Sequence, residues 1–207
     1  KVLFVTPELG PWMKSGGLGE ISWSLPAALH EAGVDIRILV PAYAPLLAAF
    51  PDAKQVAELP PPGGDLPACR LLETRTDGGA PLLLLDCPIF FRRAGSAYLD
   101  AGGNDFVDNH LRFGLLSKIA ALLSSTASPL HWRPDVLHCN DWPCGLAPAY
   151  LHFMKGIKAA TVMSIHNMAF QGIFPAETLS ALGLPPEAFS IGGAEVGGKL
   201  SFMQAGL

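Results

Sequence analysis

The sequence predicts an α/β fold built on a parallel sheet, and three features near its start carry that prediction. An apolar, β-branched run at residues 2–5 is typical of a buried strand. A glycine loop and a helical pattern follow it and end at Gly33, and a second apolar run at 34–40 ends at Pro41. Strand, helix and strand in this order form a βαβ unit, which implies a right-handed crossover and a parallel sheet.

The rest of the chain continues the alternation. Residues 43–67 are expected to be rich in loops, with the clearest break at residues 60–64, PPPGG. Further elements are expected as follows: neighbouring strands or a hairpin at 69–74 and 81–87, a helix at 105–124, strands at 135–139 and 160–165 with a helix at 145–154 between them, and an apolar helical pattern at 199–207.

The helix expected over 105–124 carries polar residues in its first turns. Asp105 or Asp108 is expected near its N-terminus. Asp108, Asn109 and Arg112 would ordinarily form a solvated face.

Composition excludes several classes of function. The chain has 207 residues, with 14 basic against 18 acidic side chains, and it carries no basic stripe, so nucleic-acid binding is not expected. Its longest apolar run, Pro81 to Leu85, is too short to cross a membrane. No secretory signal is visible, so the expected location is the cytoplasm. The four cysteines lack the spacing of a disulfide framework or a metal site, so reduced thiols and no metal are expected.

The loop after the first strand contains Lys14 and then Gly16-Gly17-Leu18-Gly19. A strand, a glycine loop and a helix in succession aim backbone N–H groups and the positive end of a helix at an anion. The spacing matches neither the dinucleotide fingerprint nor the P-loop. Glycines also serve tight turns and close packing of a helix on a strand, so both interpretations stay open here.

Two later strands deliver polar and aromatic residues at their carboxyl ends. Asp141-Trp142 follows the strand at 135–139, and His166-Asn167 follows the strand at 160–165. Ligands of open parallel sheets bind at carboxyl ends, so these groups and the glycine loop converge if the strands are neighbours. Taken singly, the histidine could close a strand end, the aspartate could cap a helix and the tryptophan could belong to the core. Together they suit a sugar, whose hydroxyls need directional hydrogen bonds and whose apolar face packs on an aromatic ring.

Four ordered stretches now carry a resemblance to bacterial glycogen synthases and plant starch synthases: KSGGLGE at 14–20, DNHLRF at 108–113, RPDVLHCNDWPCGLAPAYL at 133–151 and SIHNMAFQGIFP at 164–175. The resemblance implies a GT-B glycosyltransferase with two Rossmann-like domains. Residues 1–207 would be the N-terminal, acceptor-side domain, and the C-terminal nucleotide-binding domain would be absent from this chain. The implied reaction transfers glucose from ADP-glucose to the non-reducing end of an α-1,4-glucan with retention, and ADP-glucose is a substrate, with no cofactor.

The resemblance also implies roles for individual residues. His166, Asp141 and Glu20 would be catalytic. The implied substrate-binding residues are Lys14, Gly16 and Gly17 toward the sugar nucleotide, Trp142 toward glucose or the acceptor glucan, Asn167 toward the transferring glucose, and Gln171.

The sequence departs from the family's pattern at five positions. Ser15 replaces threonine and Glu20 replaces aspartate. Asn140 and Pro143 replace the two histidines of the H-D-W-H motif, so roles that rest on those histidines do not transfer. Phe106 stands where members of the family can carry tyrosine.

Two further hypotheses remain beside a glucan synthase half that is inactive alone. One is a GT-B enzyme that uses a different sugar nucleotide. The other is a non-catalytic carbohydrate-binding module, because one scaffold can serve several functions.

Overall fold

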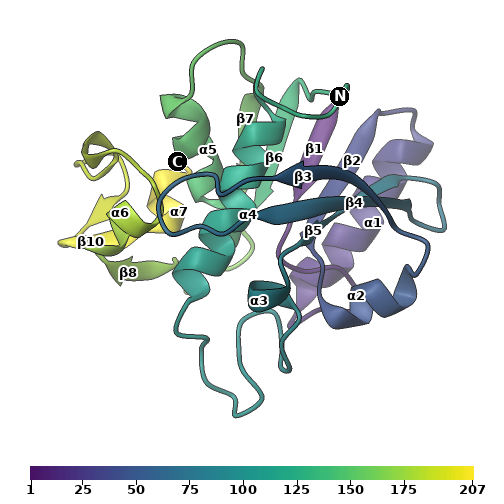
Figure 1. The fold of residues 1–207 in the computed structure, drawn as a ribbon, viewed down its shortest axis with the longest axis horizontal. Coiled ribbons are helices and arrows are strands. Elements are labelled where there is room, and N and C mark those ends of the chain that lie inside the picture. Colours follow the sequence, from purple (N-terminus) through teal and green to yellow (C-terminus); the bar gives the residue numbers. More distant parts are fainter.

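A seven-stranded sheet in the order β3-β4-β5-β2-β1-β6-β7 organises the fold, and a three-stranded sheet, β8-β10-β9, lies beside it (Figure 1). The computed structural model describes residues 1–207. The strands are β1 Val2–Val5, β2 Ile36–Pro41, β3 Lys54–Leu59, β4 Cys69–Arg75, β5 Pro81–Asp86, β6 Val136–Asn140, β7 Ala160–Ser164, β8 Ile173–Pro175, β9 Glu195–Val196 and β10 Lys199–Ser201. The α-helices are α1 Gly17–Glu31, α2 Ala44–Ala49, α3 Pro88–Phe91, α4 Asn109–Leu123, α5 Leu146–Phe153, α6 Thr178–Ala181 and α7 Phe202–Ala205, and short 3₁₀ turns span Trp142–Cys144 and Pro186–Ala188.

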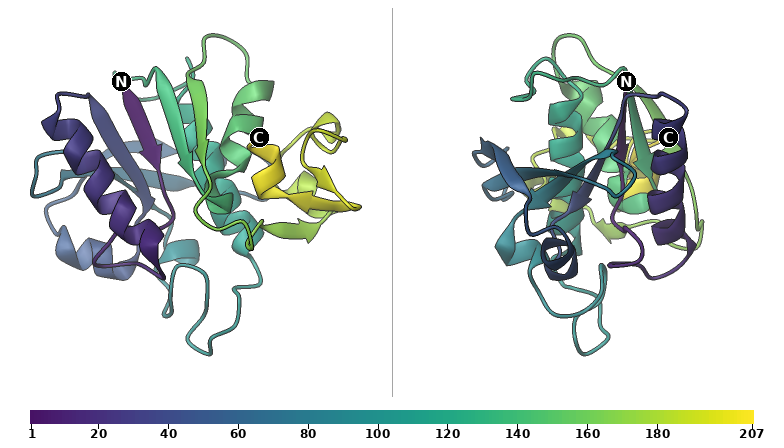
Figure 2. Two further views of the ribbon diagram at one scale, coloured as in Figure 1. Left: turned by 180° about the vertical axis from the view of Figure 1, so that it is seen from behind. Right: turned by 90° about the vertical axis from the view of Figure 1, so that its right-hand side faces the viewer.

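The parallel part of the large sheet confirms the predicted α/β architecture. Strand β1 pairs in parallel with β2 on one side and β6 on the other, and β7 extends the sheet in parallel beyond β6. The chain therefore winds outward in both directions from β1. Helix α1 covers one face of the sheet, and α4 covers the opposite face (Figure 2). The reversal of strand order between β1 and β6 creates a crevice at their carboxyl ends.

The other part of the sheet is antiparallel. Strand β4 pairs antiparallel with β5 and with β3, which confirms the hairpin expected around residues 69–87. The expectation of loops over 43–67 was wrong in two places, because α2 and β3 form there. Strand β3 is polar and mostly exposed, so its backbone pairing with β4 stabilises it and no buried apolar stripe marks it in the sequence.

Two other boundaries differ from the prediction. Helix α4 begins at Asn109, four residues after the expected start at 105, because residues 92–108 form a loop that extends past the carboxyl edge of the sheet (Figure 1). Residues 199–207 are not one helix, since β10 occupies 199–201 and pairs with β8 and β9 before α7 begins. None of the helices combines the length and apolar character that a membrane crossing requires.

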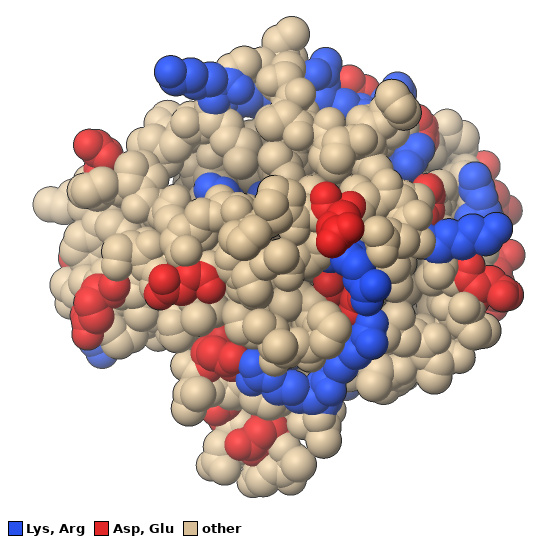
Figure 3. All heavy atoms as spheres, in the orientation of Figure 1, with Lys and Arg blue, Asp and Glu red and all other residues tan.

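Charged side chains of both signs lie next to one another on the face shown in Figure 3. Arg70 and Arg92 both pair with the buried carboxylate of Asp86, and Arg93 pairs with Asp108. Each of these three arginines therefore has a carboxylate partner.

Candidate functional site

A cavity of about 570 Å³ lies at the carboxyl ends of β1, β6 and β7, where the sequence predicted a site. It is lined by Glu8, Ser15, Gly16, Gly17, Leu18, Ile21, Ser96, Tyr98, Leu99, Asp105, Asp141, Trp142, His166, Asn167 and Phe170. The predicted convergence of the three strand ends is therefore observed. A second cavity of about 550 Å³, beside α5 and residues 187–194, contains none of the predicted site residues.

The glycines of this loop serve both roles that the sequence left open, close packing and ligand binding, but at different positions. A Cβ atom at Gly19 would lie 2.4 Å from Cβ of Lys14, and one at Gly10 would lie 3.0 Å from the carbonyl oxygen of Gly19. These two glycines serve close packing. A Cβ atom at Gly16 or Gly17 would meet nothing within 4 Å, and both residues line the cavity. Gly16 precedes α1 without a side-chain cap, so the free N–H groups of the first turn lie at the cavity.

Glu8 is a site residue that the sequence reasoning missed. Its side chain is buried, and the two carboxylate oxygens bond different walls of the cavity. The Tyr98 hydroxyl donates to Oε1 at 2.6 Å, and the Ser15 backbone N–H donates to Oε2 at 2.8 Å. Glu8 thereby joins the glycine loop to the loop 92–108. Its position three residues after β1, at the same edge as Asp141, was the signal that could have found it.

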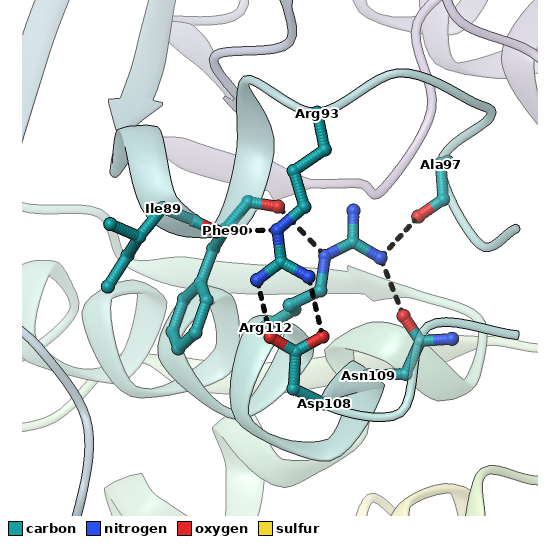
Figure 4. Close-up of polar contacts among 7 residues, drawn as sticks. All are labelled: Ile89, Phe90, Arg93, Ala97, Asp108, Asn109 and Arg112. Atoms are coloured by element: carbon teal, nitrogen blue, oxygen red, sulfur yellow. Dashed lines mark hydrogen bonds and ion pairs between the residues drawn. The ribbon is translucent and has the colours of Figure 1, made fainter. Parts of the chain in front are cut away.

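The loop 92–108 is held in place by arginines, which corrects the prediction of a solvated face on α4. Asn109 is 4% exposed and Arg112 is 1% exposed. Arg112 donates from Nε to the Phe90 carbonyl at 3.0 Å, and from Nη1 to the Ala97 carbonyl at 2.9 Å and the Asn109 Oδ1 at 2.6 Å (Figure 4). The loop folds back over the first turn of α4 and covers these side chains.

Arg93 closes the base of the same loop. It donates from Nη1 to Asp108 Oδ1 at 2.9 Å, and its second guanidinium nitrogen bonds the other carboxylate oxygen (Figure 4). Asp108 therefore occupies the position before α4 but makes no side-chain cap there. Burial alone would raise the pKa of Asp108, but the hydrogen bond and charge of Arg93 outweigh burial and lower it.

Asp141 is the most strained and least satisfied residue of the site. Its φ of 59° and ψ of 177° fall in a region that is essentially restricted to glycine. The side chain is 8% exposed, and its Oδ1 atom has no hydrogen-bond partner. Burial raises the pKa of the carboxyl group, while nearby backbone N–H groups and the charge of His166 act in the opposite direction. A buried acceptor without a partner, at the wall of a cavity, is suited to a ligand's hydrogen-bond donor.

His166 lies at the carboxyl end of β7 and is held by a neighbour from β6. Its Nε2 lies 3.1 Å from Oδ1 of the buried Asn140. Asn140 in turn donates from Nδ2 to the Val5 carbonyl in β1 at 3.0 Å. This chain of contacts ties three adjacent parallel strands together directly below the cavity.

Trp142 combines the two roles considered for it. It packs on the core through edge contacts with Phe113 and Phe202, and it also lines the cavity. Gly172, at a φ of 61°, permits this packing, because a Cβ atom there would lie 2.3 Å from Cε3 of Trp142. Phe170 and Tyr98 are further aromatic side chains at the cavity.

Three of the predicted site residues do not line the cavity. Lys14 and Glu20 form an ion pair with each other on the exposed side of the glycine loop. Gln171 donates from Nε2 to the Met168 carbonyl at 3.3 Å within its own loop. The structure thus brings together Gly16, Gly17, Asp141, Trp142, His166 and Asn167.

Comparisons with known proteins agree with this architecture. A family model described as the starch synthase catalytic domain matches residues 1–207. The chain is 55% identical over 206 residues to a glycogen synthase of Dechloromonas aromatica and 52% identical over 210 residues to one of Nitrosospira multiformis. Each alignment covers 100% of this chain and 42% of the relative, so the chain spans less than half the length of these relatives.

The fold also matches a solved structure. The catalytic domain of starch synthase IV from Arabidopsis thaliana, bound to ADP and acarbose, superposes with a TM-score of 0.79 at 21% identity, over 99% of this chain and 42% of that one. The architecture is therefore that of the Rossmann-like N-terminal domain of a GT-B glycosyltransferase. Because the family model matches this chain from residue 1 to residue 207, the chain belongs to the starch synthase catalytic domain family.

Proposed function

We propose that this chain is the N-terminal, acceptor-side half of a glycogen synthase. The full-length protein would transfer glucose from ADP-glucose to the non-reducing end of an α-1,4-glucan with retention of configuration. The names of the relatives support this assignment, and so does their length, of which this chain spans 42%. A C-terminal nucleotide-binding domain would complete the enzyme, which would act in the cytoplasm without a cofactor.

The unpartnered oxygen of Asp141 is the observation that carries the proposal. Asp141 lines the cavity, and its buried Oδ1 is costly unless a hydrogen-bond donor reaches it; a sugar hydroxyl is a donor of suitable size. The unfavourable backbone conformation of Asp141 persists only because the surrounding structure fixes it, so the position of this residue is set before any ligand binds. Trp142 would pack against the apolar face of a pyranose, and Asn167 and His166 would bond further hydroxyls.

The glycine loop would serve the departing diphosphate. Gly16 and Gly17 leave the start of α1 open, so its N–H groups can approach an anion without side-chain obstruction. Stabilising negative charge on the leaving group and positive charge on the sugar is the main task in such a transfer. Lys14 is paired with Glu20, so we expect it to contribute only when a bound anion competes for it. The catalytic role of Glu20 and the substrate-binding role of Gln171 stay proposals, and neither side chain lines the cavity.

The test is a transfer assay on the full-length protein, with ADP-glucose and UDP-glucose as alternative donors and a malto-oligosaccharide as acceptor. We expect chain elongation with α-1,4 linkages and a clear preference for ADP-glucose. Transfer from UDP-glucose alone would identify a different GT-B enzyme. Glucan binding without transfer from either donor would identify a carbohydrate-binding module and overturn the proposal.

Titration of the two substrates into this chain tests which of them the N-terminal half binds. We expect malto-oligosaccharide to bind the 207-residue chain, whereas ADP-glucose binds weakly, because the nucleotide contacts would lie in the other domain. Tight nucleotide binding without a response to the glucan would contradict the acceptor-side assignment.

A further inference from the structure

We propose that Asn140 fixes the ring proton of His166 on Nε2 and leaves Nδ1 as a bare acceptor for a ligand hydroxyl. The placement of the proton stands on the structure alone, while its use in sugar transfer rests on the proposed function. Asn140 stands where the H-D-W-H motif of the resembled family has a histidine.

The orientation of the Asn140 amide follows from its surroundings. The side chain is fully buried, and its Nδ2 lies 3.0 Å from the carbonyl oxygen of Val5 and 3.5 Å from that of His138. Carbonyl oxygens only accept hydrogen bonds, so the NH₂ group must face them. The amide oxygen consequently points the other way, toward His166.

The position of the histidine proton follows from that orientation. An amide oxygen only accepts, and Oδ1 of Asn140 lies 3.1 Å from Nε2 of His166, so Nε2 must donate. A neutral imidazole carries one proton, and a proton on Nε2 leaves Nδ1 unprotonated. The ring is exposed at the cavity, and Nδ1 has no partner in the structure. The free nitrogen therefore accepts from a hydroxyl group.

His138 is a contrasting case, because its hydrogen-bond partner does not determine which ring nitrogen carries the proton. Its Nε2 lies 2.8 Å from the hydroxyl of Ser164, which can either donate or accept. Nothing at that contact selects a tautomer. Since a histidine at position 140 could likewise present a donor or an acceptor, the asparagine removes a choice that the family's usual residue leaves open.

The first experiment is ¹⁵N NMR on the protein labelled at its six histidines, at about pH 8.5, where imidazole rings are neutral. The His166→Gln variant assigns the ring signals by their loss. We expect the Nε2 signal of His166 to be that of a protonated nitrogen and the Nδ1 signal that of an unprotonated one. The reverse pattern, or an even mixture of tautomers, would overturn the proposal.

Two substitutions at position 140 separate proton placement from packing. Leucine has the shape of asparagine but accepts no hydrogen bond, so in Asn140→Leu we expect the second tautomer to appear and the Nε2 proton to exchange with water roughly tenfold faster. In Asn140→Asp one carboxylate oxygen still accepts from Nε2, while the donor to the Val5 carbonyl is lost, so we expect the original tautomer to persist in a less stable protein. Ser164→Ala is the matched control, since it removes the partner of His138 and should leave His166 unchanged. A single protected tautomer in Asn140→Leu would show that Asn140 only fills space.

Activity of the full-length protein then tests the proposed function separately. We expect Asn140→Leu to lower kcat roughly tenfold, with a smaller change in KM for the sugar nucleotide, and Asn140→Asp to recover part of that loss. If the NMR results hold but kcat is unchanged, proton placement is correct and the proposed use of His166 in transfer is wrong.

Discussion

Two buried carboxylates that line the cavity, Glu8 and Asp141, differ in how their oxygens are satisfied. Glu8 accepts hydrogen bonds at both oxygens, one from the Tyr98 hydroxyl and one from the Ser15 backbone. Asp141 has an oxygen without a partner and a backbone conformation unfavourable for any residue but glycine. The Glu8 wall is therefore built for stability, whereas the Asp141 wall keeps an unsatisfied acceptor available to a ligand.

This difference indicates where binding energy would be used. A satisfied carboxylate gains little from a ligand, because its bonds are already made within the protein. An unsatisfied one regains its hydrogen bond only when a donor arrives. Substitutions on the two walls should consequently separate stability from activity.

The largest expected effect is on activity, at the Asp141 wall. If the proposed function holds, we expect Asp141→Asn to lower kcat of the full-length protein by about 100-fold or more, because the carboxylate charge at the proposed sugar site is lost. The free energy of unfolding should stay the same or rise. In Asp141→Gly we expect the free energy of unfolding to rise by about 1 kcal/mol, since glycine adopts this backbone conformation without strain. Kinetics and urea denaturation check the two parts, and a clear loss of stability in both variants would contradict the comparison.

The second effect is on stability, in the loop that forms the Glu8 wall. Arg112→Met removes the donor to the carbonyls of Phe90 and Ala97, so we expect the free energy of unfolding to fall by about 3 kcal/mol. Arg75→Met is the control, because Arg75 is exposed and bonds only the carbonyl of Gly79. Equal effects of the two substitutions in urea denaturation would show that the buried arginine does not hold the loop.

A smaller loss of stability is expected at Glu8 itself. Glu8→Ala leaves the hydroxyl of the half-buried Tyr98 and the Ser15 N–H without their acceptor, which costs about 2 kcal/mol. Glu58→Ala, on the exposed edge strand β3, should change stability little. Thermal unfolding of both variants measures the difference, and a neutral Glu8→Ala would show that the two loops are not joined by this residue.

The smallest effect is a difference in pH dependence between two aspartates. The folded pKa of Asp141 is raised above 3.8, so its contribution to stability is complete below that pH and is lost as the pH rises through the folded pKa. The folded pKa of Asp108 is lowered, so its contribution is present above 3.8 and is lost as the pH falls through the folded pKa. Urea denaturation of Asp141→Asn and Asp108→Asn between about pH 3 and 6 should change the pH slope in opposite directions. Changes of the same sign would refute the assignment.

Local sequence patterns determined much of the fold. Apolar runs bounded by glycine and proline located β1, β2, β5, β6 and β7, because the signal of each strand lies within a few residues, even for β7 at the exposed edge of the sheet. Their parallel order predicted that Asp141, Trp142, His166 and Asn167 would meet the glycine loop at one edge, and they do. Strand β3 was not predicted, since this exposed edge strand depends on pairing with β4 and has no run of buried apolar residues.

Only the tertiary structure decided how the site is held. The bond from Tyr98 to Glu8 joins residues 90 positions apart, and the bond from His166 to Asn140 joins residues 26 apart. The sequence placed Arg112 on a solvated face, but a loop from outside its helix buries it. Residue types and spacing therefore determined which chemical groups reach the cavity, because that depends on local strand and turn patterns. Which of those groups are satisfied, strained or free for a ligand depends on contacts between distant segments, and only folding brings those segments together.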